Sequence, residues 1–527
     1  HKAIGHGNGD LENTDDDLVA LGISNVTTEI ANYLSSIITP LADELNRTNW
    51  GLTRLGSKSR VWTNDEFVEH VNPYNNGNQQ SANRYYSPLV KNLNIYHDFD
   101  QDGENIDCVV IDNGAWHGHP EFVDENGISQ IKDIILDGPF YIDPQYFISN
   151  SKTTNYLGRT TCTETAAKEW WTDSTKRSSS FSNVPTLSTS TIPLVYTRLE
   201  MCGTYSAYPS HSIVEAEFAN HGTPCASSVY GKNFGWAYKA NKWNVAANAG
   251  QATVINVEKI YEILKIFVEN KPLVSGIKYP TVISTSYISG TTVANEFTSG
   301  SYWYQYRSEA IGTFSDKATA PNFLKNFVDG NNAFYGAPTT NPAHQDAGDD
   351  LANLEGVIWI ASAGNANQNV TKPGDLDHDN YWTNVDPNGG SFDPSIHRYF
   401  VNRRSSPGNF GYDSVTNEYN VFYAGALGAF LDDNYKEGKD WYSNSGTGVD
   451  FLSPSSGVLA AAGNTSQELF TRYDSQDFYS WLSKEAYDTE IGGTSTAAPV
   501  FAGFIASKLS DLYYWGVENV RKYIRDL

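Results

Sequence analysis

Short apolar runs separated by long polar stretches set the pattern of this chain. The runs cover residues 106–111, 281–283, 356–361 and 420–424. Runs this short and this uniformly apolar are typical of strands that are buried on both faces of a parallel sheet. Helical periodicity occupies 257–267 and 496–512. The alternation predicts an α/β fold with a mainly parallel central sheet.

The remaining segments divide the chain into an extension and one large domain. Apolar positions spaced as in a helix occur between 26 and 46, after an acidic opening that runs through Asp17. We interpret residues 1–48 as an N-terminal extension, acidic and partly helical, and residues 49–527 as a single domain. Polar segments rich in Ser, Thr, Asn and Gly predict long insertions on the rim of the sheet, at about 124–210, 291–350 and 370–415.

Charge and composition narrow the class of protein. The 527 residues carry a formal charge of −25, which disfavours nucleic acid as a partner because its phosphates would be repelled. No window approaches the ~20 apolar residues of a membrane span. Four cysteines are few for a disulfide scaffold. Cys108 and Cys225 are expected to be buried thiols, whereas Cys162 and Cys202 fit a disulfide or two free thiols equally well.

The first candidate for chemistry is Ser495, within the run Gly492 to Pro499. Two glycines allow close approach of a substrate, and the apolar residues that follow predict a buried helix whose N-terminus offers N–H groups to an anion. A serine nucleophile needs this setting. A Gly-Thr-Ser turn also caps many ordinary helices, so the motif alone does not decide between the two interpretations.

Three further residues occupy comparable places. Asp112 ends an apolar run and precedes Asn113-Gly114, His221 precedes a run of small residues, and Asn365 follows the run at 356–361. The carboxyl ends of parallel strands are where open α/β sheets bind ligands. Each residue also has a plain structural interpretation: a capping aspartate, a surface histidine and a turn-forming asparagine.

Taken in order, these motifs resemble those of the subtilisin-like serine proteases, the subtilases. The resemblance rests on Asp102 to Gly114, His221-Gly222-Thr223, Ala363-Gly364-Asn365 and Gly493-Thr494-Ser495, with Trp50 to Arg54 and Val449 to Pro454 as further similar segments. It implies a three-layer subtilisin-like fold and a protein or peptide substrate, with no cofactor required for the chemistry. Ser495 would be the nucleophile, His221 the base, Asp112 its partner and Asn365 an oxyanion donor.

The sedolisin-type serine-carboxyl proteases share that fold, and the run around Ser495 would suit them too. They use a glutamate as base and an aspartate in the oxyanion hole, whereas this chain has His221 and Asn365 in those places. A histidine base predicts activity that rises with pH through about 6–7. An optimum near pH 4 would favour the carboxyl mechanism.

Two further segments refine the resemblance. Ile283 to Gly290 resembles the strand that pairs with the substrate backbone, which would make Ser286, Tyr287 and Ile288 substrate-binding residues; the alternative is an ordinary core strand. Subtilases have a small residue where Ile288 stands, so we expect Ile288 to narrow or occlude the primary pocket. Cys225 matches the cysteine beneath the histidine of thiol-dependent subtilases, and this predicts inhibition by mercurials that displace His221.

Two acidic runs have spacing compatible with Ca²⁺, because alternate carboxylates supply hard oxygen ligands in a tight loop. A solvated acidic loop is the alternative interpretation of each run. The candidate ligands are Asp98, Asp100 and Asp102 in the first run, and Asp375, Asp377 and Asp379 in the second.

A resemblance also concerns the biological setting. The segments 136–140 and 235–243 resemble subtilase-like proteins encoded by large tailed phages. This implies a virion-associated or extracellular protease, with other virion proteins as partners. A different class of function stays open, a structural or binding module of a virion that retains the protease fold but is silent.

Overall fold

The computed structural model describes residues 101–133, 221–246, 257–428, 438–461, 488–512 and 517–526, some with short gaps inside them, together with Leu55 and two short strands before residue 100. The predicted helix at 26–46, most of the insertion at 124–210, and both Cys162 and Cys202 lie outside the described residues. Among the helices that are described, none has the length and apolar content needed to cross a membrane.

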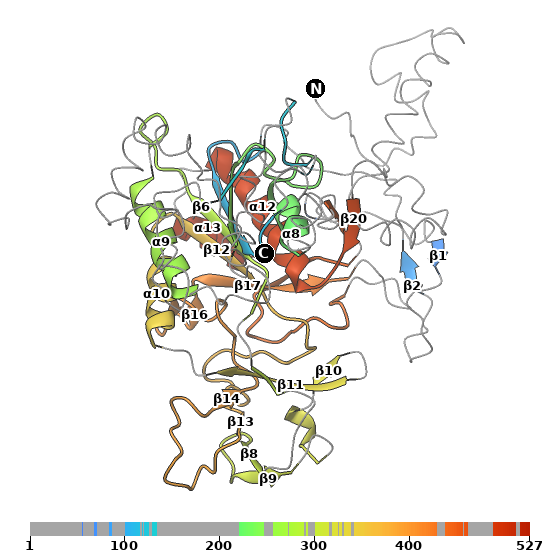
Figure 1. The fold of residues 1–527 in the computed structure, drawn as a ribbon, viewed down its shortest axis with the longest axis vertical. Coiled ribbons are helices and arrows are strands. Elements are labelled where there is room, and N and C mark those ends of the chain that lie inside the picture. The colour runs from blue at the N-terminus through green and yellow to red at the C-terminus, as the bar shows by residue number, and fades with distance from the viewer. Residues whose placement is uncertain are drawn as a thin grey trace, which may run out of the picture.

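A seven-stranded parallel sheet forms the centre of the molecule, in the order β18-β17-β12-β6-β3-β5-β4 (Figure 1). Its strands, in chain order, are β3 (Asp107–Asp112), β4 (Ile131–Asp133), β5 (Asn241–Ala246), β6 (Thr281–Thr285), β12 (Val357–Ser362), β17 (Val421–Leu427) and β18 (Phe451–Pro454). All four apolar runs of the sequence supply one of these strands. The prediction of an α/β fold with a mainly parallel sheet is confirmed.

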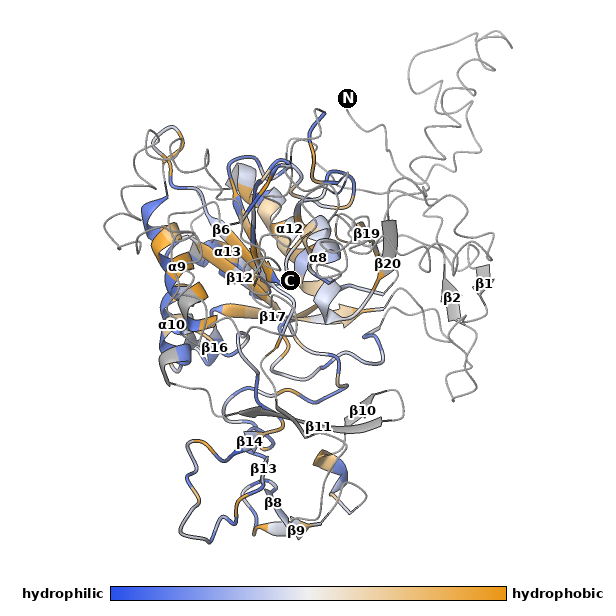
Figure 2. Ribbon diagram, viewed as in Figure 1, coloured by the Kyte–Doolittle hydropathy of each residue, from blue (hydrophilic) through white to orange (hydrophobic). Residues whose placement is uncertain are grey.

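The sheet is buried on both faces, which explains its continuous apolar runs. Along β3, Val109 and Ile111 join one core cluster, whereas Cys108 and Val110 join the other. Figure 2 shows the hydrophobic residues concentrated along β6, β12 and β17. Full burial of such a side chain contributes about 1.5–3 kcal/mol to folding.

Helices cover both faces and complete three layers (Figure 1). One face carries α9 (Val257–Asn270) and α10 (Pro342–Ala352), which pack against each other. The other face carries α8 (Gly222–Tyr230), α12 (Thr494–Leu512) and α13 (Val517–Arg525). Small residues in α8 and α12, including Ala226, Ala498 and Ala502, are fully buried, and the two helices are in direct contact.

A second sheet, wholly antiparallel, lies at the lower end of the molecule in Figure 1. It comes from two segments that the sequence predicts as insertions, and part of it packs on a small core around Phe314, Leu324 and Trp382. The strands are β7 (Thr291–Val293), β8 (Tyr302–Gln305), β9 (Gly312–Phe314), β10 (Asn326–Val328), β11 (Asn331–Pro338), β13 (Tyr381–Thr383) and β14 (Tyr399–Phe400), with a 3₁₀ turn at Asn322–Leu324. The polar composition of these segments does not predict a sheet.

Three two-stranded ribbons complete the described structure. They are β1 (Val68–His70) with β2 (Arg84–Tyr86), β15 (Tyr412–Asp413) with β16 (Glu418–Tyr419), and β19 (Val458–Ala461) with β20 (Asp488–Ile491).

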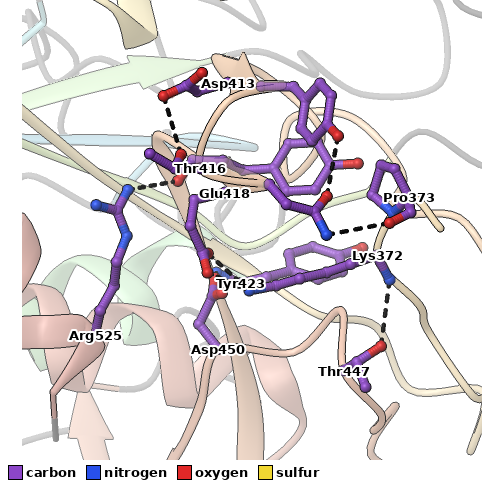
Figure 3. Close-up of polar contacts among 12 residues, drawn as sticks. Lys372, Pro373, Asp413, Thr416, Glu418, Tyr423, Thr447, Asp450 and Arg525 are labelled. Carbon is purple, nitrogen blue, oxygen red and sulfur yellow. Dashed lines mark hydrogen bonds and ion pairs between the residues drawn. The ribbon is translucent and has the colours of Figure 1, made fainter. Parts of the chain in front are cut away.

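The β15–β16 ribbon is fastened to the loop that follows β12 (Figure 3). Lys372 Nζ lies 2.7 Å from the Glu418 carboxylate, and the Asn417 side chain donates to the carbonyl of Pro373 at 3.1 Å. Beneath the ribbon, Asp450 accepts the Tyr423 N–H at 2.7 Å and pairs with the fully buried Arg404 at 2.6 Å. Because a buried cation needs a paired anion, this pair joins the segment after β14 to the residue before β18, and the Tyr423 N–H joins β17 to the same carboxylate.

Candidate active site

The site begins where β3 ends, at Asp112. Its side chain is 4% exposed, and Oδ1 accepts the Asn113 N–H at 2.7 Å. The same oxygen lies 2.7 Å from His221 Nδ1, although the two residues are 109 positions apart. A short bond to a buried carboxylate fixes the imidazole ring and places the Nδ1 proton between them. The other carboxylate oxygen, Oδ2, is buried and has no hydrogen-bond partner among the described residues.

The close approach of α8 to β3 depends on Gly222. A Cβ on this residue would lie 1.9 Å from the Gly114 carbonyl oxygen, so a side chain is excluded. The Gly222 N–H donates to Asn113 Oδ1 at 2.7 Å and ties the first turn of the helix to the end of the strand. The Gly that follows His221 in the sequence is therefore a steric requirement for bringing His221 to Asp112.

Charge around His221 favours its protonated form. Asp112, which is the largest influence, and next Cys225 raise the pKa of the imidazole above its ordinary value, while desolvation acts in the opposite direction. The histidine side chain is nonetheless 46% exposed, so its outer edge is open to a substrate.

Cys225 lies beneath this histidine. Its Sγ is 4.0 Å from His221 Nδ1 and donates to the Ser495 carbonyl at 3.3 Å. Burial, followed by the charge of Asp112, raises the pKa of the thiol. The sulfur is therefore a neutral thiol that packs between the histidine and the serine turn, as the sequence predicts for a buried cysteine.

Ser495 is the second residue of α12 and follows a glycine turn. Gly493 has φ +88°, a conformation that favours glycine, and its N–H donates to the Tyr442 hydroxyl at 2.8 Å. The Ser495 hydroxyl donates to the Ser286 carbonyl at 3.2 Å and not to His221 in this structure. In return the Ser286 hydroxyl donates to the Ser495 carbonyl at 2.8 Å. Ser286, the first residue after β6, thus bonds both the hydroxyl and the carbonyl of the serine.

Asn365 stands opposite, just after β12. Its carboxamide oxygen accepts the Thr494 N–H at 2.8 Å and the Thr494 hydroxyl at 2.9 Å. The oxygen is therefore oriented toward the serine turn, and the NH₂ group of this exposed residue is left for another acceptor. The arrangement suits an anion that forms next to Ser495.

Asn444 orders the turn around Asn365, a role that no motif in the sequence predicts. Its side-chain oxygen accepts the N–H groups of Ala366 at 3.1 Å and Gln368 at 2.9 Å, and its NH₂ group donates to the Ala363 carbonyl at 2.7 Å. This buried carboxamide satisfies three backbone groups of a loop distant in sequence. A buried asparagine between Ser443 and Ser445 has no local pattern that would reveal such contacts.

The predicted substrate segment lies beside the serine. Ser286 contacts Ser495 as described, and the Tyr287 hydroxyl lies 3.1 Å from the Tyr261 hydroxyl. Burial raises the pKa of both tyrosines, so both stay neutral. Ile288 is half-buried and packs against the core cluster that includes Ala363.

The acidic runs show other contacts. Asp98 and Asp100 lie outside the described residues, and Asp102 pairs with Lys239 at 2.7 Å. In the second run, Asp377 pairs with Arg307, Asp379 with Arg403, and Asp375 accepts from Lys372 N–H and the Thr447 hydroxyl.

Within the described part of the chain, the one group of three metal-ligating side chains close enough to share an ion is Asp112, His221 and Cys225. Binding of Ca²⁺ to either acidic run stays a prediction, and a melting temperature that does not change with a chelator would contradict it.

Comparison with known proteins gives one family. The sequence model described as the subtilase family matches residues 110–526. No curated protein sequence matches the chain. Among solved structures, the chain is similar to a cold-adapted subtilisin-like serine proteinase, with 13% identity, coverage of 88% of this chain and 86% of that chain, and a TM-score of 0.35. It is also similar to a psychrophilic protease, with 13% identity, coverage of 81% and 83%, and a TM-score of 0.36. Sphericase gives 14% identity, coverage of 78% of each chain and a TM-score of 0.34.

The family match contains Asp112, His221, Asn365 and Ser495 and spans most of the sequence, and the chain therefore belongs to the subtilase family.

Proposed function

We propose that this protein is a serine endopeptidase in which Asp112, His221 and Ser495 act as a catalytic triad and Asn365 donates to the oxyanion. The family match supports a serine protease. The observation that carries the assignment of residues is the 2.7 Å contact between Asp112 and His221, next to the turn that presents Ser495. The pairing of a histidine with an aspartate also favours this mechanism over a carboxyl base.

The chemistry follows from these positions. Ser495 Oγ bonds to the scissile carbonyl carbon while its proton passes to His221 Nε2, after the hydroxyl turns away from Ser286. The resulting oxyanion accepts from the Asn365 NH₂ group and the Ser495 N–H. Collapse breaks the C–N bond, and His221 returns the proton to the leaving amine. Water then repeats both steps, which releases the new carboxylate and restores the serine.

Asp112 serves this cycle without itself gaining the proton. Its Oδ1 accepts the Nδ1–H of His221, which selects the tautomer whose Nε2 is free to take the serine proton. The positive imidazolium that forms is then next to a buried negative charge, so its formation is stabilised where the reaction requires it.

Labelling with a fluorophosphonate probe tests the proposal, together with hydrolysis of a casein or peptide substrate. The wild-type protein should be labelled and active, Ser495→Ala should lose both, and Ser510→Ala, on the same helix, should keep both. Labelling of neither the wild type nor the control would contradict the proposal and would favour the silent virion module. Location on a virion or outside a cell stays a prediction, because the family match does not test it.

A further inference from the structure

Two backbone segments flank the nucleophile and define where the residue before the scissile bond must lie. On one side the Ser286 carbonyl lies 3.2 Å from Ser495 Oγ. On the other side the turn from Ala363 to Asn365 is joined to the serine turn through Thr494. A substrate residue whose carbonyl carbon reaches Ser495 Oγ, with its oxygen toward Asn365, has its Cα between these segments. Its side chain then enters the space that they border.

Ile288 already occupies this space. Its Cδ1 lies 3.0 Å from the position that a Cβ on Gly364 would take, so the tip of the isoleucine contacts the backbone of the opposite segment. Gly364 has φ +96° and carries no side chain that could be withdrawn to make room. The isoleucine side chain therefore crosses the space between the two backbone segments.

Hydrogen bonds hold both backbone segments in place. The Gly364 N–H donates to the Thr494 hydroxyl at 3.0 Å, and the Gly364 carbonyl accepts the Asn444 N–H at 2.9 Å. In the segment that carries Ile288, the hydroxyl of the preceding residue, Tyr287, contacts the Tyr261 hydroxyl. A β-branched side chain has few χ1 rotamers, so Ile288 has little freedom to swing out of the gap.

We propose that Ile288 determines specificity by closing the primary pocket, so that the enzyme accepts glycine or alanine before the scissile bond and rejects long aliphatic and aromatic residues. The inference rests on the proposed function, because it concerns the substrate of that same site. One methylene in a well-packed pocket changes kcat/KM by about 10–200-fold. A phenylalanine exceeds alanine by a whole ring, so alanine should be preferred by at least about 10²-fold.

Four fluorogenic peptides that differ only in the residue before the scissile bond test the inference: Gly, Ala, Leu and Phe. The wild type should cleave the Gly and Ala peptides and discriminate against Leu and Phe. Ile288→Gly should raise kcat/KM for the Phe peptide by about 10–200-fold while that for the Ala peptide changes far less. Ile288→Ala should give an intermediate gain if the glycine variant folds poorly. Ile396→Gly, at an exposed isoleucine, should leave the preference unchanged.

Fluorophosphonate labelling of every variant separates the two levels of the proposal, because the reactive phosphoryl group needs no large pocket. Absence of labelling in the wild type would count against the proposed function itself. A labelled wild type that cleaves the Phe peptide as well as the Ala peptide would overturn the inference about Ile288. Labelling without cleavage of the Gly and Ala peptides would overturn it too, as would an Ile288→Gly variant that is labelled but keeps the wild-type preference.

Discussion

The two flanks of the active site are built from different kinds of interaction. On the flank of β3 and α8, a buried carboxylate, a half-exposed imidazole and a buried thiol lie within 4.8 Å of one another. Their contacts depend on charge: Asp112 raises the pKa of His221, and burial raises that of Cys225. We therefore expect this flank to respond to pH.

On the flank of β12 and α12 the contacts that Asn365 and Asn444 make are between neutral groups. Asn365 accepts twice from Thr494, and Asn444 binds three backbone groups of the adjoining turn. The difference teaches how the two tasks are divided. Proton transfer needs groups whose charge changes, whereas a developing oxyanion needs donors that are already fixed in place. Each flank can therefore be damaged in its own way.

Asp112→Asn should have the largest effect among substitutions that leave Ser495 in place. An asparagine can present its NH₂ group to Nδ1, which selects the wrong tautomer of His221 and leaves the imidazolium without a counter-charge. We expect kcat to fall by about 10⁴-fold. Steady-state hydrolysis measures the loss, and Asp346→Asn, at an exposed position of α10, is the matched control. A loss of less than about tenfold would show that Asp112 does not orient the base.

The pH dependence distinguishes the flanks directly. The base must be neutral, and the pKa of His221 is raised, so kcat/KM should rise with pH along a limb that lies above the ordinary histidine range near 6.5. Residual activity of Asp112→Asn should have its limb at lower pH. The same raised pKa stabilises the fold fully below about pH 6.5, and this contribution is lost as pH rises through the folded-state value. Denaturation of the wild type and of Asp112→Asn at several pH values measures this contribution. The difference between their free energies of unfolding should decrease as pH rises.

Asn365→Ala should reduce kcat by about 10²–10³-fold, because one preorganised oxyanion donor is removed. Asn365→Asp is a sharper test: its carboxylate can still accept from Thr494, but it has no NH₂ group to donate. Asn365→Ala should keep the wild-type acid limb, since His221 and Asp112 are untouched, whereas the added carboxylate of Asn365→Asp should raise the pKa of His221 and move the limb to higher pH. An acid limb that moves in Asn365→Ala would mean that the two flanks are not separable. Asn388→Ala, at an exposed asparagine, is the control for folding.

The four candidate catalytic residues could be found in the sequence because each lies near the end of a strand or the start of a helix. Asp112 ends β3 and Asn365 follows β12, two strands built around apolar runs, and His221 and Ser495 lie at helix starts marked by glycine. Strand ends and helix starts meet at one edge of a parallel sheet, so local pattern marks each residue as a candidate, and the resemblance to subtilases joins the four into one predicted site.

The remaining contacts arise from packing between distant segments, which local pattern does not encode. Asn444 lies in a polar stretch and binds a loop about 80 residues earlier, and Ile288 is recognisable only by its size until Gly364 is seen opposite it. The antiparallel sheet escaped prediction for a similar reason. Tyr302–Gln305 is half-buried along its whole length and the core of the sheet is small, so a hydrophobic run does not mark this strand.

Asn444→Ala tests whether the neutral flank works through position alone. The substitution leaves three backbone groups near Asn365 without their partner, and one unsatisfied buried group costs about 1–3 kcal/mol. We expect a lower free energy of unfolding and a loss in kcat of up to about 10²-fold, since small displacements of a donor are costly. Urea denaturation and hydrolysis measure the two effects. Lower stability with wild-type kcat would show that the turn keeps its geometry without Asn444.

Cys225→Ala should have the smallest effect on turnover, because a neutral thiol supplies neither charge nor nucleophile to the reaction. Its consequence appears with a mercurial. Mercury bound at Sγ, which lies 4.0 Å from His221 Nδ1, would displace the imidazole and abolish activity in the wild type. Cys225→Ala should resist this inhibition, whereas Cys108→Ala should remain sensitive, since the buried thiol of Cys108 lies within β3. Equal sensitivity of the wild type and Cys225→Ala would place the reactive thiol elsewhere and remove this sulfur from the charged flank.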